Sequence, residues 1–356
     1  MIPLIKPELP DMSKWIVYLQ SSYDSCHFSN NGPCVSLLEN RLGEYLGAEA
    51  SPLLVANATT GLITAIKALD LTDCEILVPS FTFAATALAI TNTGNTPVFV
   101  DIDDDLFFSI TDAELKITKN TKALIVVHTL GAIPDNEKYE RFAEKHGLKL
   151  IFDAATTFGL SYQSNKIGMA GDVEVFSFHA TKTFGVGEGG LLSSKSSELL
   201  DRARSIVNFG FDENSDVSGH GFNGKMSELP AAVGLAMLDE LPARFIKRNK
   251  IADMYQMKLL GNKKIKIYDT PARQMTVVVF KENKERDFVI KAFAERKIGC
   301  KIYYRPLHVH TFFKSNIYLP KTDDAFSKCL SIPMYDSMTE SDIDEIVEVL
   351  NGVHDE

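Results

Sequence analysis

The sequence lacks a long hydrophobic run, a cysteine framework and an excess of basic residues. No apolar run reaches the ~18 residues of a membrane-spanning helix, and the first residues lack the basic and apolar regions of a signal peptide. The five cysteines are scattered and form no C-x-x-C pair, which is typical of reduced cytoplasmic thiols. A formal net charge of −10 argues against a nucleic-acid surface. We therefore expect a cytoplasmic protein that binds neither membrane nor nucleic acid.

Short apolar runs alternate with helix-length segments between residues 53 and 194. Because these runs are apolar almost throughout, they read as strands buried on both faces, which predicts an α/β fold with a mostly parallel seven-stranded sheet covered by helices. The predicted strands are Leu53–Ala56, Ile76–Pro79, Pro97–Asp101, Ala123–His128, Leu148–Asp153, Val173–Phe178 and Gly190–Ser193.

The rest of the chain changes to α+β order. We predict helices at Glu198–Val207, Ser227–Leu238, Ala243–Leu260, Glu285–Lys297 and Glu340–Asn351, the last with Thr339 as N-cap, and β runs at Gln274–Phe280 and Lys301–Tyr304. This order predicts a large α/β domain over residues 1–244, including an N-terminal arm and helix, and a small α+β domain over residues 245–356.

Lys182 lies on a short loop between two predicted strands, beside small residues. In an apolar pocket a lysine favours the neutral amine, which can attack a carbonyl carbon. The glycines that follow, 185–190, also match the dinucleotide pattern G-x-G-x-x-G. That pattern should open a helix, whereas here it leads into another apolar, strand-like run, so a dinucleotide-binding loop is disfavoured.

Other predicted strand ends carry polar or aromatic groups. The segment Asn57–Gly61 opens a helix, where free N–H groups bind phosphate, although a simple N-cap is the alternative. Asp153 is either an ordinary strand-end residue or the partner of a protonated pyridine nitrogen. Phe83 either stacks on a flat ring or packs in the core. His308 and His310 would share one face of a strand, but they lack a third ligand nearby, so we expect no metal site.

Seven segments occur in the order found in the DegT/DnrJ/StrS family, and the chain resembles that family from residue 32 to 333. The resemblance implies a fold-type-I, pyridoxal-phosphate-dependent aminotransferase that acts on nucleotide-linked keto sugars. The segments are Asn57-Ala-Thr-Thr-Gly-Leu62, Pro79-Ser-Phe-Thr-Phe83, Pro97-Val-Phe-Val-Asp101, Asp153-Ala-Ala155, Ser177-Phe-His-Ala-Thr-Lys182, Gly187-Glu-Gly-Gly190 and Gly221-Phe-Asn-Gly-Lys-Met-Ser-Glu228.

The resemblance also implies roles for single residues. Lys182 would form the internal aldimine with pyridoxal 5'-phosphate and move protons, and Asp153 would pair with the pyridine nitrogen. Phe83 would stack on the ring. Asn223 would reach the phosphate of the neighbouring subunit, which implies a homodimer with shared sites. The remaining cofactor contacts would come from Ala58, Thr59, Thr156 and Ser177, and the sugar-nucleotide side from Asn30, Lys225 and His308.

Three positions depart from the family pattern. Ala58 stands where glycine is usual, Thr156 where glutamine or histidine is common near the cofactor, and Lys225 where arginine is frequent. The segment Tyr304-Arg-Pro-Leu-His308 resembles one that lines the sugar-nucleotide pocket, in a form closer to 4-aminotransferases than to 3-aminotransferases.

The resulting prediction is a ping-pong transfer of an amino group from glutamate, which leaves as 2-oxoglutarate, to a nucleotide-linked 4-keto-6-deoxyhexose. The product would be a deoxyamino sugar for a surface polysaccharide such as an O-antigen. The alternatives are a 3-aminotransferase acting on a 3-keto sugar nucleotide, a non-catalytic regulatory protein of the same fold, and a dinucleotide-dependent oxidoreductase. The intact Lys182 and Asp153 argue against the regulator.

Overall fold

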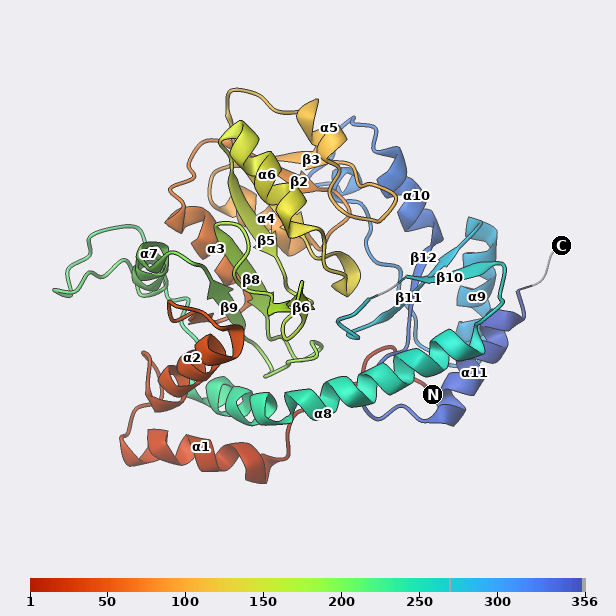
Figure 1. Ribbon diagram of the computed structural model, residues 1–356, viewed down its shortest axis with the longest axis horizontal. Coiled ribbons are helices and arrows are strands. Elements are labelled where there is room, and N and C mark those ends of the chain that lie inside the picture. Colours follow the sequence, from red (N-terminus) through yellow and green to blue (C-terminus); the bar gives the residue numbers. More distant parts are fainter. Residues whose placement is uncertain (269, 354–356) are drawn as a thin grey trace.

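A seven-stranded sheet forms the centre of the larger lobe (Figure 1), in a computed structural model that describes residues 1–268 and 270–353. The strand order is β1-β9-β8-β5-β4-β2-β3. Six strands run in one direction and β9 is antiparallel to both of its neighbours, which confirms the predicted sheet. The strands are β1 (Leu53–Val55), β2 (Glu75–Pro79), β3 (Thr96–Val100), β4 (Thr121–Val127), β5 (Lys149–Asp153), β8 (Val173–Ser177) and β9 (Gly190–Ser193).

Helices cover both faces of this sheet because successive strand residues point to opposite sides. Val175 packs on the face under α3 (Ala58–Ala68), α4 (Ala84–Asn92) and α7 (Ser197–Val207). Phe176 packs on the other face, with α2 (Pro33–Leu46) and the first half of α8 (Glu228–Lys258). That face continues under α5 (Ile110–Glu114) and α6 (Asn136–His146), and α1 (Met12–Asp24) lies against α2 and α8.

The smaller lobe is built on an antiparallel three-stranded sheet in the order β10-β11-β12. Its core joins this sheet to α9, α11, the second half of α8 and Ile2 of the N-terminal segment. The elements of this lobe are β10 (Ile265–Tyr268), β11 (Thr276–Phe280), β12 (Cys329–Ile332), α9 (Asn283–Glu295), α10 (Pro320–Lys328) and α11 (Glu340–Asn351). The 3-10 turn η2 (Leu307–Val309) precedes α10, whereas the hairpin β6 (Ser161–Tyr162) and β7 (Asn165–Lys166) and the 3-10 turn η1 (Thr129–Gly131) belong to the larger lobe.

Three predicted elements, two helices and one strand, differ in the structure. The helices expected on either side of residues 239–242 form one 31-residue helix, α8, which contains Pro242. Buried residues continue on both sides of the proline, so packing against both lobes holds the helix together there. The expected strand over residues 301–304 is absent, since only Lys301 pairs, in an isolated bridge with Ser331.

Two further expectations concern the same part of the chain. The predicted domain boundary at residues 244/245 falls inside α8, so no loop separates the lobes at that point. His308 lies in η2 and His310 directly follows it, so these two side chains do not share one face of a strand. Within residues 1–268 and 270–353, no group of three or more His, Cys, Asp or Glu side chains could hold a metal ion.

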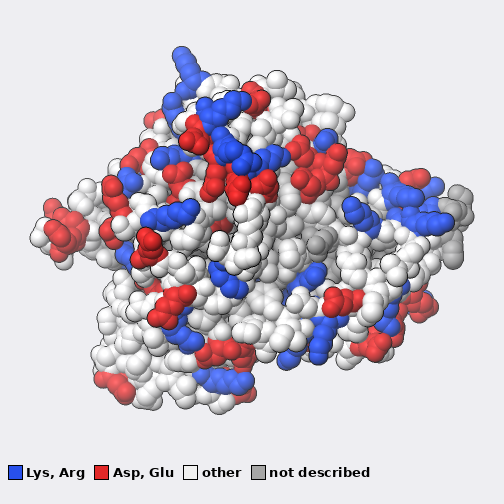
Figure 2. Space-filling model, viewed as in Figure 1, with Lys and Arg blue, Asp and Glu red and all other residues white. Residues whose placement is uncertain are grey.

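The surface charges, the cysteines and the apolarity of the helices bear on the expectations from the composition. On the face shown in Figure 2, acidic and basic side chains are interspersed over both lobes. All five cysteines are free thiols, and three of them are buried. None of the helices in the described part of the chain is long and apolar enough to cross a membrane.

Candidate active site

The carboxyl ends of the parallel strands bring most of the predicted cofactor residues to one edge of the sheet. Asn57 follows β1, Phe83 lies shortly after β2, Asp153 ends β5 and Ser177 ends β8. Ligands in such sheets bind outside the carboxyl ends of the strands. The strand order therefore assembles a site from segments that are far apart in the sequence.

Lys182 lies on the loop between β8 and β9. Backbone bonds from the Lys182 N–H to the His179 carbonyl (2.8 Å) and from the Val186 N–H to the Phe178 carbonyl (2.8 Å) fold this loop back on itself. Burial lowers the pKa of the Lys182 ammonium to about 8, and the negative charge of Asp153 acts against this fall. Near neutral pH, Lys182 therefore has a larger fraction of neutral, nucleophilic amine than an exposed lysine has.

Asp153 is buried, and both of its carboxylate oxygens are bound. The Thr86 hydroxyl donates to Oδ2 (2.7 Å) and the Ala155 N–H donates to Oδ1 (3.2 Å). Burial raises the pKa of the Asp153 carboxyl, while these two donors and Lys182 act against the rise. Sequence reasoning missed Thr86. Its only signal was its position three residues after Phe83, at the start of the predicted helix.

The start of α3 forms the candidate phosphate end of the site. Asn57 is the N-cap and accepts from the Thr60 N–H (2.9 Å), so the first-turn N–H groups of Ala58 and Thr59 have no partner within the helix. Gly190 passes close beside this turn. A Cβ atom on Gly190 would lie 2.8 Å from the Asn57 carbonyl carbon and 2.9 Å from the Ala58 nitrogen. Gly190, the last glycine of the G-x-G-x-x-G match, thus lets β9 pack closely against the start of α3. Because Gly190 begins a strand and not a helix, the dinucleotide interpretation is wrong.

Three more predicted cofactor contacts lie around this edge. The Phe83 side chain is 63% exposed, so its ring is available to a ligand. The Ser177 hydroxyl accepts from the His179 N–H (3.3 Å) and has one hydrogen left to donate. The Thr156 hydroxyl instead donates to the His128 carbonyl (3.0 Å), a bond within the protein.

Asn223 and Lys225 lie on a segment that runs beside β1. The Ala56 N–H donates to the Gly224 carbonyl (2.7 Å), which places this segment next to the start of α3. Lys225 Nζ donates to the Asn208 side chain (2.8 Å) and lies 4.7 Å from the centre of the Phe209 ring. Partial burial lowers the pKa of Lys225. The segment thus reaches the predicted phosphate end from its own chain.

The two other predicted substrate residues lie in different settings. Asn30 is exposed on the turn before α2, with a left-handed φ of 58°. His308 is buried, with Nδ1 2.8 Å from the Ser80 hydroxyl and Nε2 3.6 Å from Asp323. The structure therefore places His308 in a contact between the two lobes. The roles of both residues in substrate binding stay predictions.

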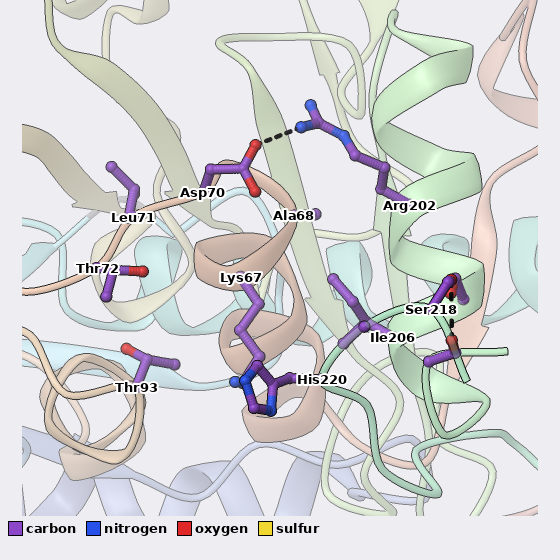
Figure 3. Close-up of a pocket in the computed structure, with 13 residues that line it drawn as sticks. Lys67, Ala68, Asp70, Leu71, Thr72, Thr93, Arg202, Ile206, Ser218 and His220 are labelled. Atoms are coloured by element: carbon purple, nitrogen blue, oxygen red, sulfur yellow. Dashed lines mark hydrogen bonds and ion pairs between the residues drawn. The ribbon is translucent and has the colours of Figure 1, made fainter. Parts of the chain in front are cut away.

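A separate open cavity lies away from this site, between α3, α7 and the loop that follows α7 (Figure 3). Its volume is about 440 Å³, and its lining includes Lys67, Arg202 and His220. Arg202 is already paired with Asp70 at 2.6 Å. Neither Lys182 nor Asp153 lines this cavity, so it is not the site of their chemistry.

The residues at the sheet edge fit pyridoxal phosphate. A half-buried lysine of lowered pKa suits the aldehyde, the buried carboxylate suits the ring nitrogen, and the free N–H groups at the start of α3 suit the phosphate. Because Gly190 has no Cβ, strand β9 can lie close to the first turn of α3 at this phosphate end. The fold and the site together define a fold-type-I pyridoxal-phosphate enzyme.

The chain belongs to the DegT/DnrJ/EryC1/StrS aminotransferase family, whose model matches residues 12–351. This match confirms the predicted family and enzyme class, together with pyridoxal 5'-phosphate as the cofactor of that class. A dTDP-4-amino-4,6-dideoxy-D-glucose transaminase from Shigella dysenteriae is 38% identical over 256 residues, 71% of this chain and 69% of that protein. A protein of the same name from Escherichia coli is 30% identical over 366 aligned positions, 99% of this chain and 98% of that protein.

A similar solved structure is that of DesI, determined in the presence of its TDP-sugar product. It superposes with a TM-score of 0.90 at 30% identity, over 98% of this chain and 93% of DesI. The shared fold therefore extends over both lobes, including the small antiparallel sheet.

Proposed function

We propose that this protein transfers an amino group from glutamate to C4 of a dTDP-linked 4-keto-6-deoxyhexose. Family membership supports the reaction type, and the observation that carries the proposal is that Lys182, with its lowered pKa, and the buried carboxylate of Asp153 lie at the same sheet edge. The names of the two transaminases and of the TDP-sugar complex support the substrate. The protein acts as a cytoplasmic homodimer whose product is a deoxyamino sugar for a surface polysaccharide.

Four residues of the chain, Ala58, Thr59, Asp153 and Lys182, would bind the cofactor or move a proton in this reaction. Pyridoxal phosphate, when bound, supplies the electron sink that stabilises negative charge at the carbon that loses its proton. Asp153, held on both oxygens by Thr86 and Ala155, keeps a positive charge on the ring nitrogen. Lys182 Nζ would hold the aldehyde end of the cofactor, and its neutral amine would serve as the base that moves a proton within the site. Ala58 and Thr59 bind the phosphate at the start of α3.

An absorbance spectrum of the purified protein, before and after addition of glutamate, tests the first half-reaction. We expect a visible band of lysine-bound cofactor that glutamate converts to a near-ultraviolet band. The dTDP-linked 4-keto-6-deoxyhexose should then restore the visible band, and mass and NMR spectra of the product should place nitrogen at C4. Nitrogen at C3 would indicate the 3-aminotransferase. A protein that never acquires a visible band, even with added pyridoxal phosphate, would indicate the regulator.

A further inference from the structure

The side chain of His128 is buried at the end of β4, beside the turn that begins at Asp153. It is 1% exposed, and its ring packs edge-on against Phe152, with centroids 5.6 Å apart. Nδ1 lies 2.7 Å from the Thr157 hydroxyl, whereas Nε2 has no partner in the described part of the chain. Buried polar groups are usually hydrogen-bonded. The Nδ1 bond to Thr157 is therefore the polar contact that the side chain is built to make.

The direction of this bond follows from the hydrogens that each group can supply. The Thr157 hydroxyl lies 3.2 Å from the Ala154 carbonyl oxygen, which can only accept. The single hydrogen of the hydroxyl is used there, so the Thr157 oxygen accepts from the Nδ1–H of His128. Nε2 then carries a lone pair and no hydrogen. Burial agrees with this neutral form of the ring, because it lowers the pKa of His128 to about 3.

His128 contacts both ends of the turn that follows β5. Its N–H donates to the Asp153 carbonyl (3.0 Å), and its carbonyl accepts from the Thr156 hydroxyl (3.0 Å). These two bonds use the backbone of His128, so they survive a change of its side chain. The bond from Nδ1 to Thr157 is the third contact, and it depends on the imidazole ring.

The turn supplies one of the two donors to the Asp153 carboxylate, namely the Ala155 N–H, which donates to Oδ1 (3.2 Å). This N–H belongs to the same peptide group as the Ala154 carbonyl. The Thr157 N–H and hydroxyl both bind that carbonyl, at 3.1 and 3.2 Å. Because a peptide group is planar, fixing its carbonyl also fixes the direction of its N–H. Thr157 therefore aims the Ala155 N–H at the carboxylate.

We infer that His128 is a positioning residue that acts through Thr157 to fix the peptide group holding the Asp153 carboxylate toward the ring nitrogen of the cofactor. The inference rests on the proposed function, because it needs the cofactor bound with Asp153 at that nitrogen. A donor to the charged form of a carboxyl group keeps the pKa of that group low. Without the Nδ1 bond the pKa of Asp153 should rise further, so the ring nitrogen should meet less negative charge and its own pKa should fall.

The first test is nitrogen-15 NMR of the purified protein with labelled histidine. A ring with its hydrogen on Nδ1 gives different nitrogen signals from a ring with its hydrogen on Nε2. The signals that disappear in His128→Asn belong to His128. We expect a neutral ring with its hydrogen on Nδ1. A hydrogen on Nε2 would reverse the bond to Thr157 and would overturn the inference.

The second test measures the pKa of the ring nitrogen, by nitrogen-15 NMR of bound pyridoxal phosphate labelled at that atom. His128→Leu removes the donor, and we expect this pKa to fall by about one unit, the size of one hydrogen bond to a charged group. His128→Asn should restore most of the wild-type value. The amide nitrogen of asparagine is attached to Cγ, as Nδ1 is in histidine, so it can donate to Thr157.

A change at Thr157 tests the same bond from its other side. Thr157→Val leaves the His128 ring in place and removes the hydroxyl, so it serves even where His128→Leu does not fold. We expect the same fall as in His128→Leu, and no further fall in the double variant, because both changes break one chain of bonds. Thr64→Val is the matched control, since the Thr64 hydroxyl is also buried but has no partner in the described residues. It should leave the pKa unchanged.

The outcomes separate packing, positioning and function. His128→Leu and His128→Asn both lose the ring that packs on Phe152, so equal falls of the ring-nitrogen pKa in the two would assign the effect to packing and overturn the inference. An unchanged pKa in Thr157→Val, with the cofactor bound, would also overturn it and leave the aminotransferase proposal intact. A wild-type protein that never binds pyridoxal phosphate would refute the proposed function, and the inference with it.

Discussion

At the scale of single residues, the chemistry depends on opposite effects of burial on two charged groups. Burial lowers the pKa of Lys182 to about 8 and raises the pKa of Asp153, because burial disfavours the charged form of both groups. In the proposed reaction, Lys182 would need this effect to act as a nucleophile, whereas Asp153 would have to resist it to pair with a ring nitrogen. In the proposed reaction, the hydrogen bonds from Thr86 and Ala155 would help to keep Asp153 charged.

Thr86→Val tests that conclusion. The substitution keeps the shape of the side chain and removes the 2.7 Å bond to Asp153 Oδ2. A hydrogen bond to a charged group contributes roughly 1.5–3 kcal/mol, so we expect kcat to fall about tenfold or more. Steady-state kinetics measure the change. Thr91→Val, in the same helix but bonded only to the Leu88 carbonyl, is the matched control. An equal loss in both variants would assign the effect to the helix and not to Asp153.

At the scale of elements, the strand ends were predictable because the sequence encodes them locally. Val173–Ser177 and Lys149–Asp153 are mostly apolar runs, and the structure has strands at both. The cap of α11 was equally local, since Thr339 and Asp342 bond to each other's backbone N–H groups. These features depend only on neighbouring residues.

Other contacts could not be read from the sequence because they join distant segments. Ser80 meets His308 across 228 positions, and Thr86 meets Asp153 across 67. The four-residue strands β10 and β12 are stabilised mainly by pairing with β11, so their own patterns are weak. The site roles rest on the family motifs and stay predictions.

Strand β8 carries a buried carboxyl group, Glu174, whose pKa is raised to about 8 by burial. Its Oε2 accepts from the Ala170 N–H (3.2 Å), while Oε1 has no partner in the described residues. Glu140 raises the pKa further and Lys195 opposes the rise. The folded protein therefore holds Glu174 protonated near neutral pH, on the strand that leads to Lys182.

Glu174→Gln should change how stability depends on pH. Because the folded pKa lies above the ordinary value of 4.5, the stability from protonated Glu174 is fully present below about pH 4.5 and lost as the pH rises through about 8. Glutamine cannot ionise, so we expect the variant to melt a few degrees above the wild type at pH 9 and to lose less stability on alkalinisation. Differential scanning calorimetry across this range measures it. The exposed Glu198→Gln should follow the wild-type curve, and a Glu174→Gln curve parallel to it would contradict the assignment.

Helix α2 is held at its start by a carboxylate from another helix. Glu228, the first residue of α8, accepts from the Cys34 N–H (2.6 Å), the Val35 N–H (3.1 Å) and the Ser22 hydroxyl (2.7 Å). All of these groups are buried, and a Cβ at Gly32 would collide with the same carboxylate. One side chain thus joins α1, α2 and α8.

Removing this carboxylate should destabilise the protein strongly. In Glu228→Ala the two backbone N–H groups and the serine hydroxyl lose their buried partner, and we expect the free energy of unfolding to fall by about 3 kcal/mol. Chemical denaturation at fixed protein concentration measures the fall. Glu198→Ala, at the exposed first turn of α7, should cost less than about 1 kcal/mol. Similar losses in the two variants would show that Glu228 has no special role.

At the scale of the whole molecule, buried ion pairs join the two lobes along α8. Arg244 and Arg248 of this helix both bind Asp336 of the small lobe, and Arg244 also donates to the Glu8 carbonyl of the N-terminal segment (2.7 Å). The lobes also meet where Asp101 accepts from the Thr322 N–H (2.8 Å) at the start of α10. These contacts fix the small lobe against the sheet edge.

The proposed homodimer with shared sites predicts complementation between two inactive variants. Lys182→Ala should abolish turnover, and Asn223→Asp should nearly do so, because it sets a carboxylate against the cofactor phosphate. If Asn223 serves the partner's site, a mixed dimer has one site with both changes and one with neither. After unfolding and refolding of an equal mixture, half of the dimers are mixed, so activity should return to about a quarter of the wild type. If Asn223 serves the site of its own chain, each site of the mixed dimer carries one change and the mixture stays inactive. Assays of each variant refolded alone provide the baseline.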